Sequence, residues 1–569
     1  MQQLPRGGYR FRERGSAFAM ALAFSAIVGG MIIALISLSV LQSRTTRYEL
    51  ERTGALSIAE GVTNLAKKQI LSELANFDDP SESDTSVLDG EEVTSVVGGV
   101  EVAWTATPIG EGINRVDSDG VTMAIQPYEI VAEARNDSGF ARVSQVVDVT
   151  MTPLFQFMIF FDDDLEILPG PTMYLEGRVH ANGSIYVGAG NSLQVDTDYF
   201  RATGSIYRKR KDDDRVPTGS VNIRRSETNT FINMSVNMDS ENESWTQLAL
   251  DTWYGTVQDG SHGVTEVAAP HLPTIEVDGY FHQNADLVIE DGQAYDGNGD
   301  PISLPWGVLN TRTMYDAREG TDVTLTEIDM EALNASGHFP ENGLIYAYRT
   351  DTSSSQPNGI RLTNGAELLA PLTFVTEAPL YIEGDYNTVQ KKGCAVIADA
   401  VNLLSNAWDD SKEEGDPPPT ASDTTYNLAM ITGNVRTPDG GGTYSGGFEN
   451  LPRFHEKWKD GGGKVDCNIN GAFACLYESQ YATAPWGSSN VYVPPRRNWF
   501  YDPDLLDPNN LPPFTPNTVY VRRVLWDDGA NMTFQSTHGA GYPPDTPIYN
   551  PWEYDHGFMD KVIEDPYAG

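Results

Sequence analysis

Residues 10–50 read RFRERGSAFAMALAFSAIVGGMIIALISLSVLQSRTTRYEL, and they decide how the rest of the chain is interpreted. Arginines crowd the part before Ser16, whereas the run from Ser16 to Ser43 has no charged residue. As an α-helix this run would be about 42 Å long, which exceeds the ~30 Å hydrocarbon core of a bilayer. The preceding arginines predict a cytoplasmic N-terminus, with the rest of the chain outside. The stretch therefore predicts a membrane span over residues 16–43.

The helix is predicted to continue past the membrane to about Phe77. An ordinary signal peptide ends in small residues after a short apolar core, and this stretch does not. Instead, apolar residues recur at steps of three and four further along, at Leu56, Ala59, Val62, Ala66, Ile70 and Leu74. A helix over residues 16–77 that is apolar first and amphipathic afterwards is more than a simple anchor requires.

A basic leader ending in Gly15, followed by such a helix, resembles the N-termini of type IV pilins and type II secretion pseudopilins. The segments RERGSAFAMAL and ALSIAEGVTNLA are most similar to the PilX-like minor pilins. This resemblance implies that a prepilin peptidase cleaves between Gly15 and Ser16. It also implies that the retained helix packs with other pilin-like subunits in a filament, and Gly29 and Gly30 would loosen it at mid-span.

One position departs from the pattern of the major pilins. Most of them carry glutamate as the fifth residue of the mature chain, and here that residue is Met20. Some minor pilins at filament tips also lack the glutamate. The alternative interpretation is a simple signal anchor that displays an extracellular domain.

The sequence predicts four regions. Residues 1–15 form the leader, 16–77 the long helix, 78–152 a small pilin-like β region, and 153–569 a large β-rich ectodomain with long loops. Segments such as GGVEVAWTATPI and GFARVSQVVDVTMTPL alternate apolar and polar residues, which is typical of half-buried strands. The predicted fold class is therefore mainly β with a long N-terminal α-helix.

The ectodomain is predicted to be a β-solenoid. Short alternating pairs such as Met173/Leu175 and Ile185/Val187 are separated by glycine corners, as in stacked rungs. No strict repeat is visible, so a β-sandwich remains the alternative. Within this region GGFENLPRFHEKW predicts one short helix, and the proline-rich tail is expected to end in a strand. Phrases such as PGPTMYLEGRVHANGSIY resemble large bacterial proteins that join a PilX-like N-terminus to a β-rich ectodomain, a resemblance that brings no activity.

Composition argues against several classes of function. The formal net charge is −42 and the pI is about 4.4, so phosphates would be repelled and nucleic acid is not an expected partner. No GxSxG, HExxH, P-loop or Rossmann pattern is present, and the eight histidines are scattered. The run DDDLE (162–166) could pair carboxylates for glycoside chemistry, although acidic loops are common in so acidic a chain. We therefore expect no enzyme, with a polysaccharide-active protein as the alternative.

Two smaller motifs concern metal and thiol chemistry. Asp296, Asn298 and Asp300 alternate as Ca²⁺ ligands do, but Pro301 stands where an EF-hand has glycine, which favours a solvated turn and no cofactor. Cys467 and Cys475 flank Asn470-Gly471, a hairpin signal. A loop centred on Gly471 would pair the two thiols in a disulfide, whereas a two-residue turn would misalign them by one position.

The sequence as a whole predicts a minor pilin-like component at low copy or at a filament tip, acting in assembly or adhesion. Its expected partners are other pilin-like subunits, the prepilin peptidase, the membrane through residues 16–43, and a surface or glycan ligand. It is expected in the inner membrane before processing, and in the periplasm or outside the cell on a filament afterwards. The alternative is a membrane-anchored β-helical protein that binds or cleaves polysaccharide.

Overall fold

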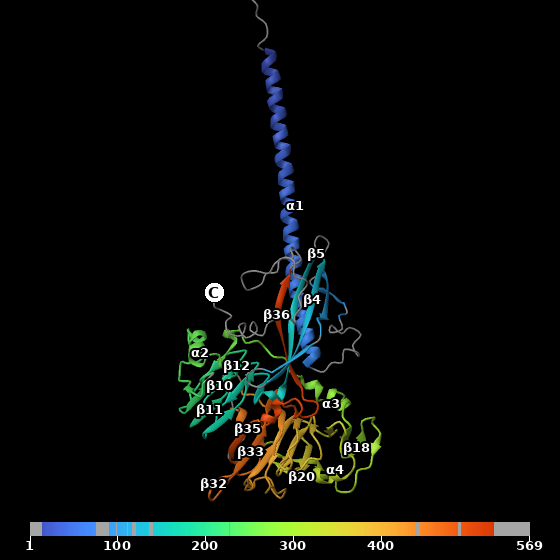
Figure 1. Ribbon diagram of the computed structural model, residues 1–569, viewed down its shortest axis with the longest axis vertical. Helices are drawn as coiled ribbons and strands as arrows, with labels where there is room; N and C mark the ends of the chain where they lie inside the picture. The colour runs from blue at the N-terminus through green and yellow to red at the C-terminus, as the bar shows by residue number, and fades with distance from the viewer. Residues whose placement is uncertain are drawn as a thin grey trace, which may run out of the picture.

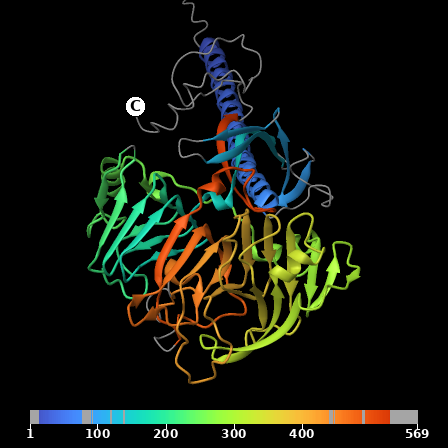
Figure 2. The same cartoon turned by 60° about the horizontal axis from the view of Figure 1, so that its bottom comes forward.

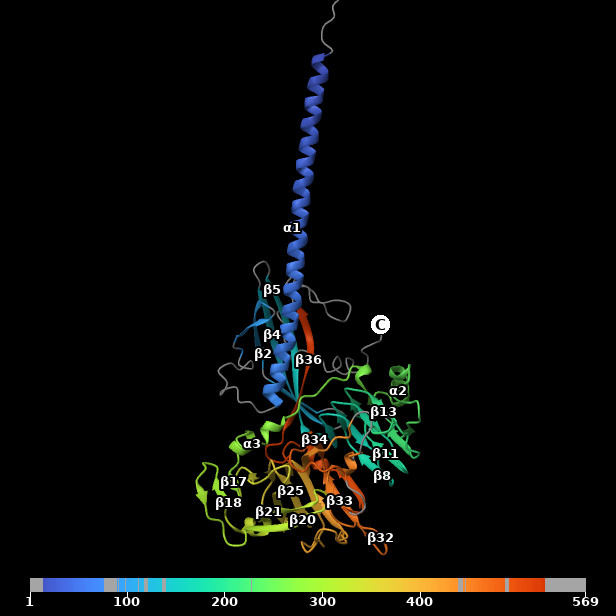
Figure 3. The same ribbon diagram turned by 180° about the vertical axis from the view of Figure 1, so that it is seen from behind.

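The computed structural model describes residues 14–75, 90, 92–97, 99–110, 112–116, 121–135, 140–226, 228–438, 444–445, 447–486 and 491–527. A long helix, α1, carries a small antiparallel sheet on its C-terminal half (Figure 1). A large body of parallel strands lies at the end of the molecule opposite the start of α1, and Figure 3 shows the same arrangement from behind.

Helix α1 spans Arg14–Ala75, in agreement with the helix predicted over residues 16–77. Of the predicted stripe, Ala59, Val62, Ala66 and Ile70 are buried, whereas Leu56 and Leu74 are partly buried. Ala55, which the prediction did not include, is buried as well. They pack against apolar side chains of the sheet, which we call the head sheet.

The head sheet is antiparallel with strand order β1-β2-β4-β5-β36, and β3 also pairs with β4. Its strands are β1 (Val93–Val97), β2 (Val100–Pro108), β3 (Ile113–Val116), β4 (Thr122–Arg135), β5 (Phe140–Pro153) and β36 (Asn517–Asp527). The last strand comes from the far end of the chain. The head is therefore not made of residues 78–152 alone, and the predicted division at residue 153 is corrected in this respect. The reason is that β5 presents an open edge, which β36 fills with an antiparallel ladder.

Between β5 and β36 the chain forms a three-sided stack of short strands, which we call the solenoid. Its first half comprises β6 (Ile159–Phe161), β7 (Leu165–Ile167), β8 (Met173–Glu176), β9 (Val179–Ala181), β10 (Ile185–Val187), β11 (Ser192–Asp196), β12 (Phe200–Ala202), β13 (Ile206–Tyr207), β14 (Ser220–Arg224), β15 (Phe231–Asn233), helix α2 (Trp245–Trp253) and β16 (Val257–Gln258). Each turn supplies one strand to each of three sheets, and β6, β9 and β12 pair in parallel as the first strands of successive turns.

The second half also stacks its turns, with longer loops, but only its later turns supply a strand to a third sheet. It comprises β17 (Leu287–Glu290), β18 (Gln293–Asp296), β19 (Pro301–Ile302), β20 (Leu309–Asp316), β21 (Thr321–Asp329), helix α4 (Met330–Ala335), β22 (Leu344–Tyr348), β23 (Gly359–Thr363), β24 (Leu372–Val375), β25 (Pro379–Glu383), β26 (Cys394–Ala398), β27 (Ala400–Leu404), β28 (Thr424–Asn427), β29 (Ala429–Asn434), β30 (Arg453–Phe454), β31 (Lys459–Asp460), β32 (Gly463–Lys464), β33 (Asp466–Gly471), β34 (Phe473–Glu478) and β35 (Arg496–Tyr501). Parallel ladders again join successive turns.

The two halves meet through the turn that is translated last in the second half and the turn that is translated first in the first half. In the twelve-stranded sheet the order is β16-β12-β9-β6-β34-β29-β26-β24-β22-β17, followed by β18 and β19. The last turn of the second half therefore pairs with the first turn of the first half, through a parallel ladder between β34 and β6. Figure 2 shows the late strands in orange at the middle, between the teal strands of the first half and the yellow strands of the second.

Two adjacent strands of the head sheet, β5 and β36, connect the head to the solenoid. The Leu154 N–H donates to the Pro516 carbonyl at 2.8 Å, and the Thr518 hydroxyl donates to the Thr152 carbonyl at 3.0 Å. The chain thus enters and leaves the solenoid side by side, as an inserted domain does. Segment 259–286, with helix α3 (Tyr280–Gln283), carries the chain from one end of the solenoid to the other.

The predicted fold class, mainly β with a long N-terminal helix, is confirmed. The ladders between successive turns of the ectodomain are parallel, whereas a β-sandwich is built from antiparallel sheets. The helix predicted for GGFENLPRFHEKW is wrong, because this segment has one 3₁₀ turn, η5 (Phe448–Asn450), followed by β30. Phe454 and Trp458 still pack edge to face, with ring centroids 5.6 Å apart, but in the solenoid core and not along a helix.

Candidate filament-packing helix and surface sites

The N-terminal half of α1 is an apolar surface without a partner in this chain. Its side chains are described from Leu22 onward, and the large apolar ones up to Leu41 are exposed, including Phe24, Met31 and Ile33. By length and composition this helix could cross a membrane. A helix that is apolar on all sides is buried by something else, either lipid or other helices.

A short polar segment, residues 43–54, separates the apolar half of α1 from the half that packs on the head sheet. It is almost entirely exposed. Arg47 and Glu51 form an ion pair at 2.8 Å, one turn apart along the helix. Where the head begins, polar contacts reinforce the packing, since Gln145 Nε2 in β5 donates to Thr63 Oγ1 at 2.9 Å. One continuous helix therefore carries a free apolar half and a half fixed to the head.

The residues predicted for processing lie at the start of this helix. Gly15, Ser16 and Met20 belong to α1, but their surroundings lie outside the described side chains, as do leader residues 1–13 entirely. Gly29 and Gly30 are helical, and a Cβ at either would meet nothing within 4 Å. Gly29 and Gly30 therefore lie on an open part of the helix, away from the head and the solenoid.

The aspartates of the acidic run at residues 162–166 form a hydrogen bond and ion pairs with residues of other turns. Asp162 accepts from Asn182 Nδ2 at 2.7 Å, and Asp164 pairs with Lys211 at 2.8 Å. Asp163 pairs with Arg436 of the second half. Burial raises the pKa of Asp162. These three aspartates hold neighbouring turns together, and Glu166, the fourth carboxylate of the run, is buried.

The predicted calcium motif is a turn between β18 and β19. Asp296 Oδ1 accepts the backbone N–H groups of Asn298 and Asp300, at 3.0 Å and 2.9 Å. These bonds use the carboxylate to close the turn. Among the residues that the structure describes, no group of three His, Cys, Asp or Glu side chains is placed to hold a metal.

The three cysteines, Cys394, Cys467 and Cys475, are free and buried, so the structure contains no Cys467–Cys475 disulfide. The hairpin on which that prediction depended does not form, because Asn470 and Gly471 are extended residues of β33. The next strand, β34, belongs to a different sheet of the solenoid. Burial raises the pKa of Cys467 and of Cys475 to about 12, which keeps both as thiols.

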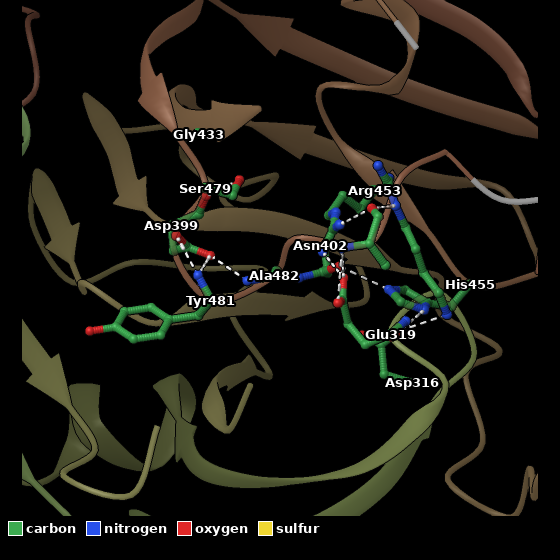
Figure 4. A network of polar contacts seen from close by, with 12 residues as sticks. Asp316, Glu319, Asp399, Asn402, Gly433, Arg453, His455, Ser479, Tyr481 and Ala482 are labelled. Atoms are coloured by element: carbon green, nitrogen blue, oxygen red, sulfur yellow. Dashed lines mark hydrogen bonds and ion pairs between the residues drawn. The ribbon is translucent and has the colours of Figure 1, made fainter. Parts of the chain in front are cut away.

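Sequence reasoning missed a buried polar network in the second half of the solenoid (Figure 4). His455 Nε2 donates to Asn402 Oδ1 at 2.9 Å, and its Nδ1 lies 3.7 Å from Asp316 Oδ1. Tyr381 donates to the other oxygen of Asp316 at 2.7 Å. Burial lowers the pKa of His455 to about 4, so the ring is neutral at physiological pH. A histidine with no exposed surface cannot meet a substrate, and its role here is structural.

The same network fixes the chain after β34. Asp399 accepts the backbone N–H groups of Gln480, Tyr481 and Ala482, the last at 2.8 Å. Arg453 pairs with Glu319 at 2.7 Å, and both side chains are buried. The residues come from distant parts of the sequence, so no local motif could have revealed them. Spacing alone does not predict which loops the turns of a solenoid bring together.

No protein-family model matches the chain, and no curated protein matches it. Among solved structures, the competence-associated pilin ComZ from Thermus thermophilus aligns over 84% of this chain and 96% of that one. The identity is 11% and the TM-score is 0.24. This score is too low to assign a shared fold, and no function follows from it.

Proposed function

We propose that the protein is a minor pilin-like component of a type IV pilus or a type II secretion-like system, and that it acts in assembly or adhesion and not in catalysis. The observation that supports this most directly is the division of α1. Its apolar half stands free of the chain's own core, while the same helix continues into the head sheet. A membrane anchor alone would not need to be continuous with the core of a folded head.

A low-copy or tip location follows from the width of the solenoid. Nine strand-to-strand steps of about 4.8 Å separate β16 from β17, or about 43 Å in all. The axes of packed helices lie only about 8–10 Å apart. Since the solenoid extends to both sides of the head (Figure 2), neighbouring helices of a shaft could not all carry one.

The residue at Met20 supports the same location. The fifth-residue carboxylate of pilins is thought to neutralise the terminal amine of the subunit ahead, and an unpaired charge in an apolar core costs several kcal/mol. A subunit without that carboxylate leaves no terminal amine unpaired if no subunit lies ahead of it. We therefore place the protein at the start of a filament or sparsely along it.

Processing is part of the proposal. The precursor would sit in the inner membrane with residues 1–15 in the cytoplasm, and prepilin peptidase would release a chain that begins at Ser16. N-terminal sequencing of protein extracted from native membranes checks this. Mature Ser16 is the expected result, and Gly15→Ala should block its appearance. An intact Met1 would favour the simple anchor.

Imaging decides the location. An antibody against the solenoid should label native filaments at their tips or at sparse points. A shaft subunit labelled in the same preparation serves as the positive control for access. Dense, regular solenoid label along the shaft would contradict the proposal, and label on cell bodies alone would favour an anchored envelope protein.

A further inference from the structure

The first half of the solenoid carries arginines that are stacked on tyrosines. Tyr199 and Arg201 are two positions apart at β12 and alternate with core residues, so both side chains lie on its outer face. The guanidinium carbon of Arg201 lies 4.2 Å from the centre of the Tyr199 ring, and that of Arg178 lies 4.1 Å from it. One turn further along, the guanidinium carbon of Arg225 lies 3.4 Å from the centre of the Tyr254 ring. We call these five residues the arginine patch.

Arg201 and Arg225 have no carboxylate partner in the part of the chain that the structure describes. Neither side chain forms an ion pair or donates a hydrogen bond there, and the Nε atom of each is buried. The terminal nitrogens also have no partner and are not among the buried atoms, so they face the solvent. Asp196 and Asp198, beside the patch, both pair with Arg224. An anion that reached the patch would therefore gain charge-assisted hydrogen bonds that no described residue supplies.

The net charge of the protein decides which anion can reach the patch. A free anionic ligand must approach a chain whose formal charge is −42, and the field of the whole molecule repels it. A segment of the same chain does not have to make this approach, because its tether keeps it near the patch at a high effective concentration. An acidic segment of this chain is therefore the favoured occupant.

The chain that follows β36 has the required composition. Residues 528–569, which lie outside the described residues, contain seven carboxylates and one basic residue, Lys561. Five of the carboxylates fall within residues 553–565, which we call the acidic segment: Glu553, Asp555, Asp560, Glu564 and Asp565. The acidic segment also contains Tyr554 and Phe558, whose rings can stack on guanidinium groups.

The acidic segment is long enough to return to the patch. β36 ends at Asp527, and Val519, about 27 Å back along the strand, pairs with Ala268. The residue before Ala268 is hydrogen-bonded to Asn182, which follows β9 beside the patch, so the way back is roughly 40–50 Å. Glu553 follows Asp527 by 26 residues, which span up to about 85 Å when extended. Figure 1 shows β12 and α2 at the side of the solenoid that lies toward the head.

We propose that the acidic segment docks on the arginine patch. Its carboxylates would accept hydrogen bonds from Arg201 and Arg225, and its aromatic rings would cover Tyr254, which is 57% exposed. The docked segment would connect the end of β36 to the first half of the solenoid and so brace the head against it. The proposal goes beyond filament membership, because these contacts lie within one chain and form whether or not α1 joins other subunits.

The test uses trypsin on the full-length protein in detergent micelles. Lys561 is the one lysine or arginine after Arg523, and cleavage there removes residues 562–569, a loss that mass spectrometry follows. An isotope-labelled peptide of residues 551–569 in the same digestion reports the rate at an undocked site. We expect cleavage in the protein to be at least about tenfold slower than in the peptide at low salt, since cleavage follows the undocked population. The difference should shrink at high salt, because salt screens the exposed charges.

Variants assign the contacts. Arg201→Gln/Arg225→Gln should bring the rate at Lys561 to within about twofold of the peptide rate. Arg215→Gln, at an exposed arginine outside the patch that pairs with Asp213, is the matched control and should keep the slow rate.

The single variant Arg225→Gln guards against misfolding of the double variant. Arg225 packs on the exposed ring of Tyr254, so folding is not at risk, and we expect faster cleavage with an unchanged melting temperature. Wild-type cleavage as fast as that of the peptide would overturn the proposal. Slow cleavage that persists in both patch variants would also overturn it, because the segment would then be held elsewhere. Neither result bears on filament location.

Discussion

At the scale of single residues, Glu449 joins the two halves of the solenoid. It belongs to η5 in the second half, and its Oε1 accepts the N–H of Leu168 in the first half at 2.5 Å. The residue is buried, and burial raises the pKa of Glu449 to about 7. The folded protein therefore holds this proton more tightly than the unfolded chain does.

The sign of the resulting pH dependence follows from this shift. A carboxyl with a raised pKa costs stability as pH rises from about 4.5 to about 7, and the full cost, up to about 3 kcal/mol, applies above pH 7. Glu449→Gln keeps an oxygen for Leu168 but carries no charge. It should be more stable than the wild type at pH 8 and equal to it near pH 4.5, as measured by urea unfolding. Exposed Glu341→Gln is the control, and a Glu449→Gln difference that does not change with pH would contradict this account.

Gly471 is needed for a close approach between turns. A Cβ built on it would lie 1.8 Å from the Leu428 carbonyl oxygen, which no rotamer change relieves. Gly471→Ala should therefore lower the free energy of unfolding by several kcal/mol. Gly461→Ala, where a Cβ meets nothing within 4 Å, should leave it nearly unchanged. Similar denaturation midpoints for both variants would show that the backbone yields at this corner.

At the scale of elements, α1 is one helix with two environments. Ala59 has no exposed surface and faces the head sheet, whereas Ser57 on the same helix is exposed. Ala59→Glu would bury an unpaired carboxylate and should unfold the head or lower its melting temperature strongly. Ser57→Glu adds the same charge in water and should have little effect. Circular dichroism of the detergent-solubilised variants checks this, and an equal response would mean that the helix does not pack as described.

Elements with local signals could be predicted from the sequence. The three- and four-residue spacing from Leu56 to Leu74 predicted the stripe of α1 that packs on the head sheet, and pairs such as Ile185/Val187 predicted rungs. The helix predicted in the segment from Phe448 to Trp458 was wrong, because aromatic residues four positions apart, such as Phe454 and Trp458, can also pack together where the chain is not helical. The contact between Asp316 and His455 could not be predicted, since it depends on which distant loops the stacking brings together.

At the scale of the whole molecule, the head is completed by the strand that returns from the solenoid. Val519 of β36 is buried in the head core, and β36 covers the edge of β5 along most of its length. A chain that ends after Pro516 should show fast amide hydrogen exchange in β4 and β5 and unchanged protection in the solenoid strands. A chain that ends after Asp527 retains β36 and should protect the head normally. Full protection of β5 in the shorter chain would show that the head folds without its last strand.

The reversed order of the two solenoid halves has a consequence for biogenesis. The turn that begins at Ile159 is translated early, but its neighbour on one side, β34, appears only after more than half of the remaining chain has been made. Until then the edge of β6 is an unpaired template for any extended segment nearby. The strand at Phe473–Glu478 joins the two halves, because it pairs with β6 on one side and with β29 on the other. It is also the last strand of the twelve-stranded sheet to be translated. A nascent chain that stalls before this strand would keep an unpaired strand edge at the centre of the sheet, which quality control could recognise.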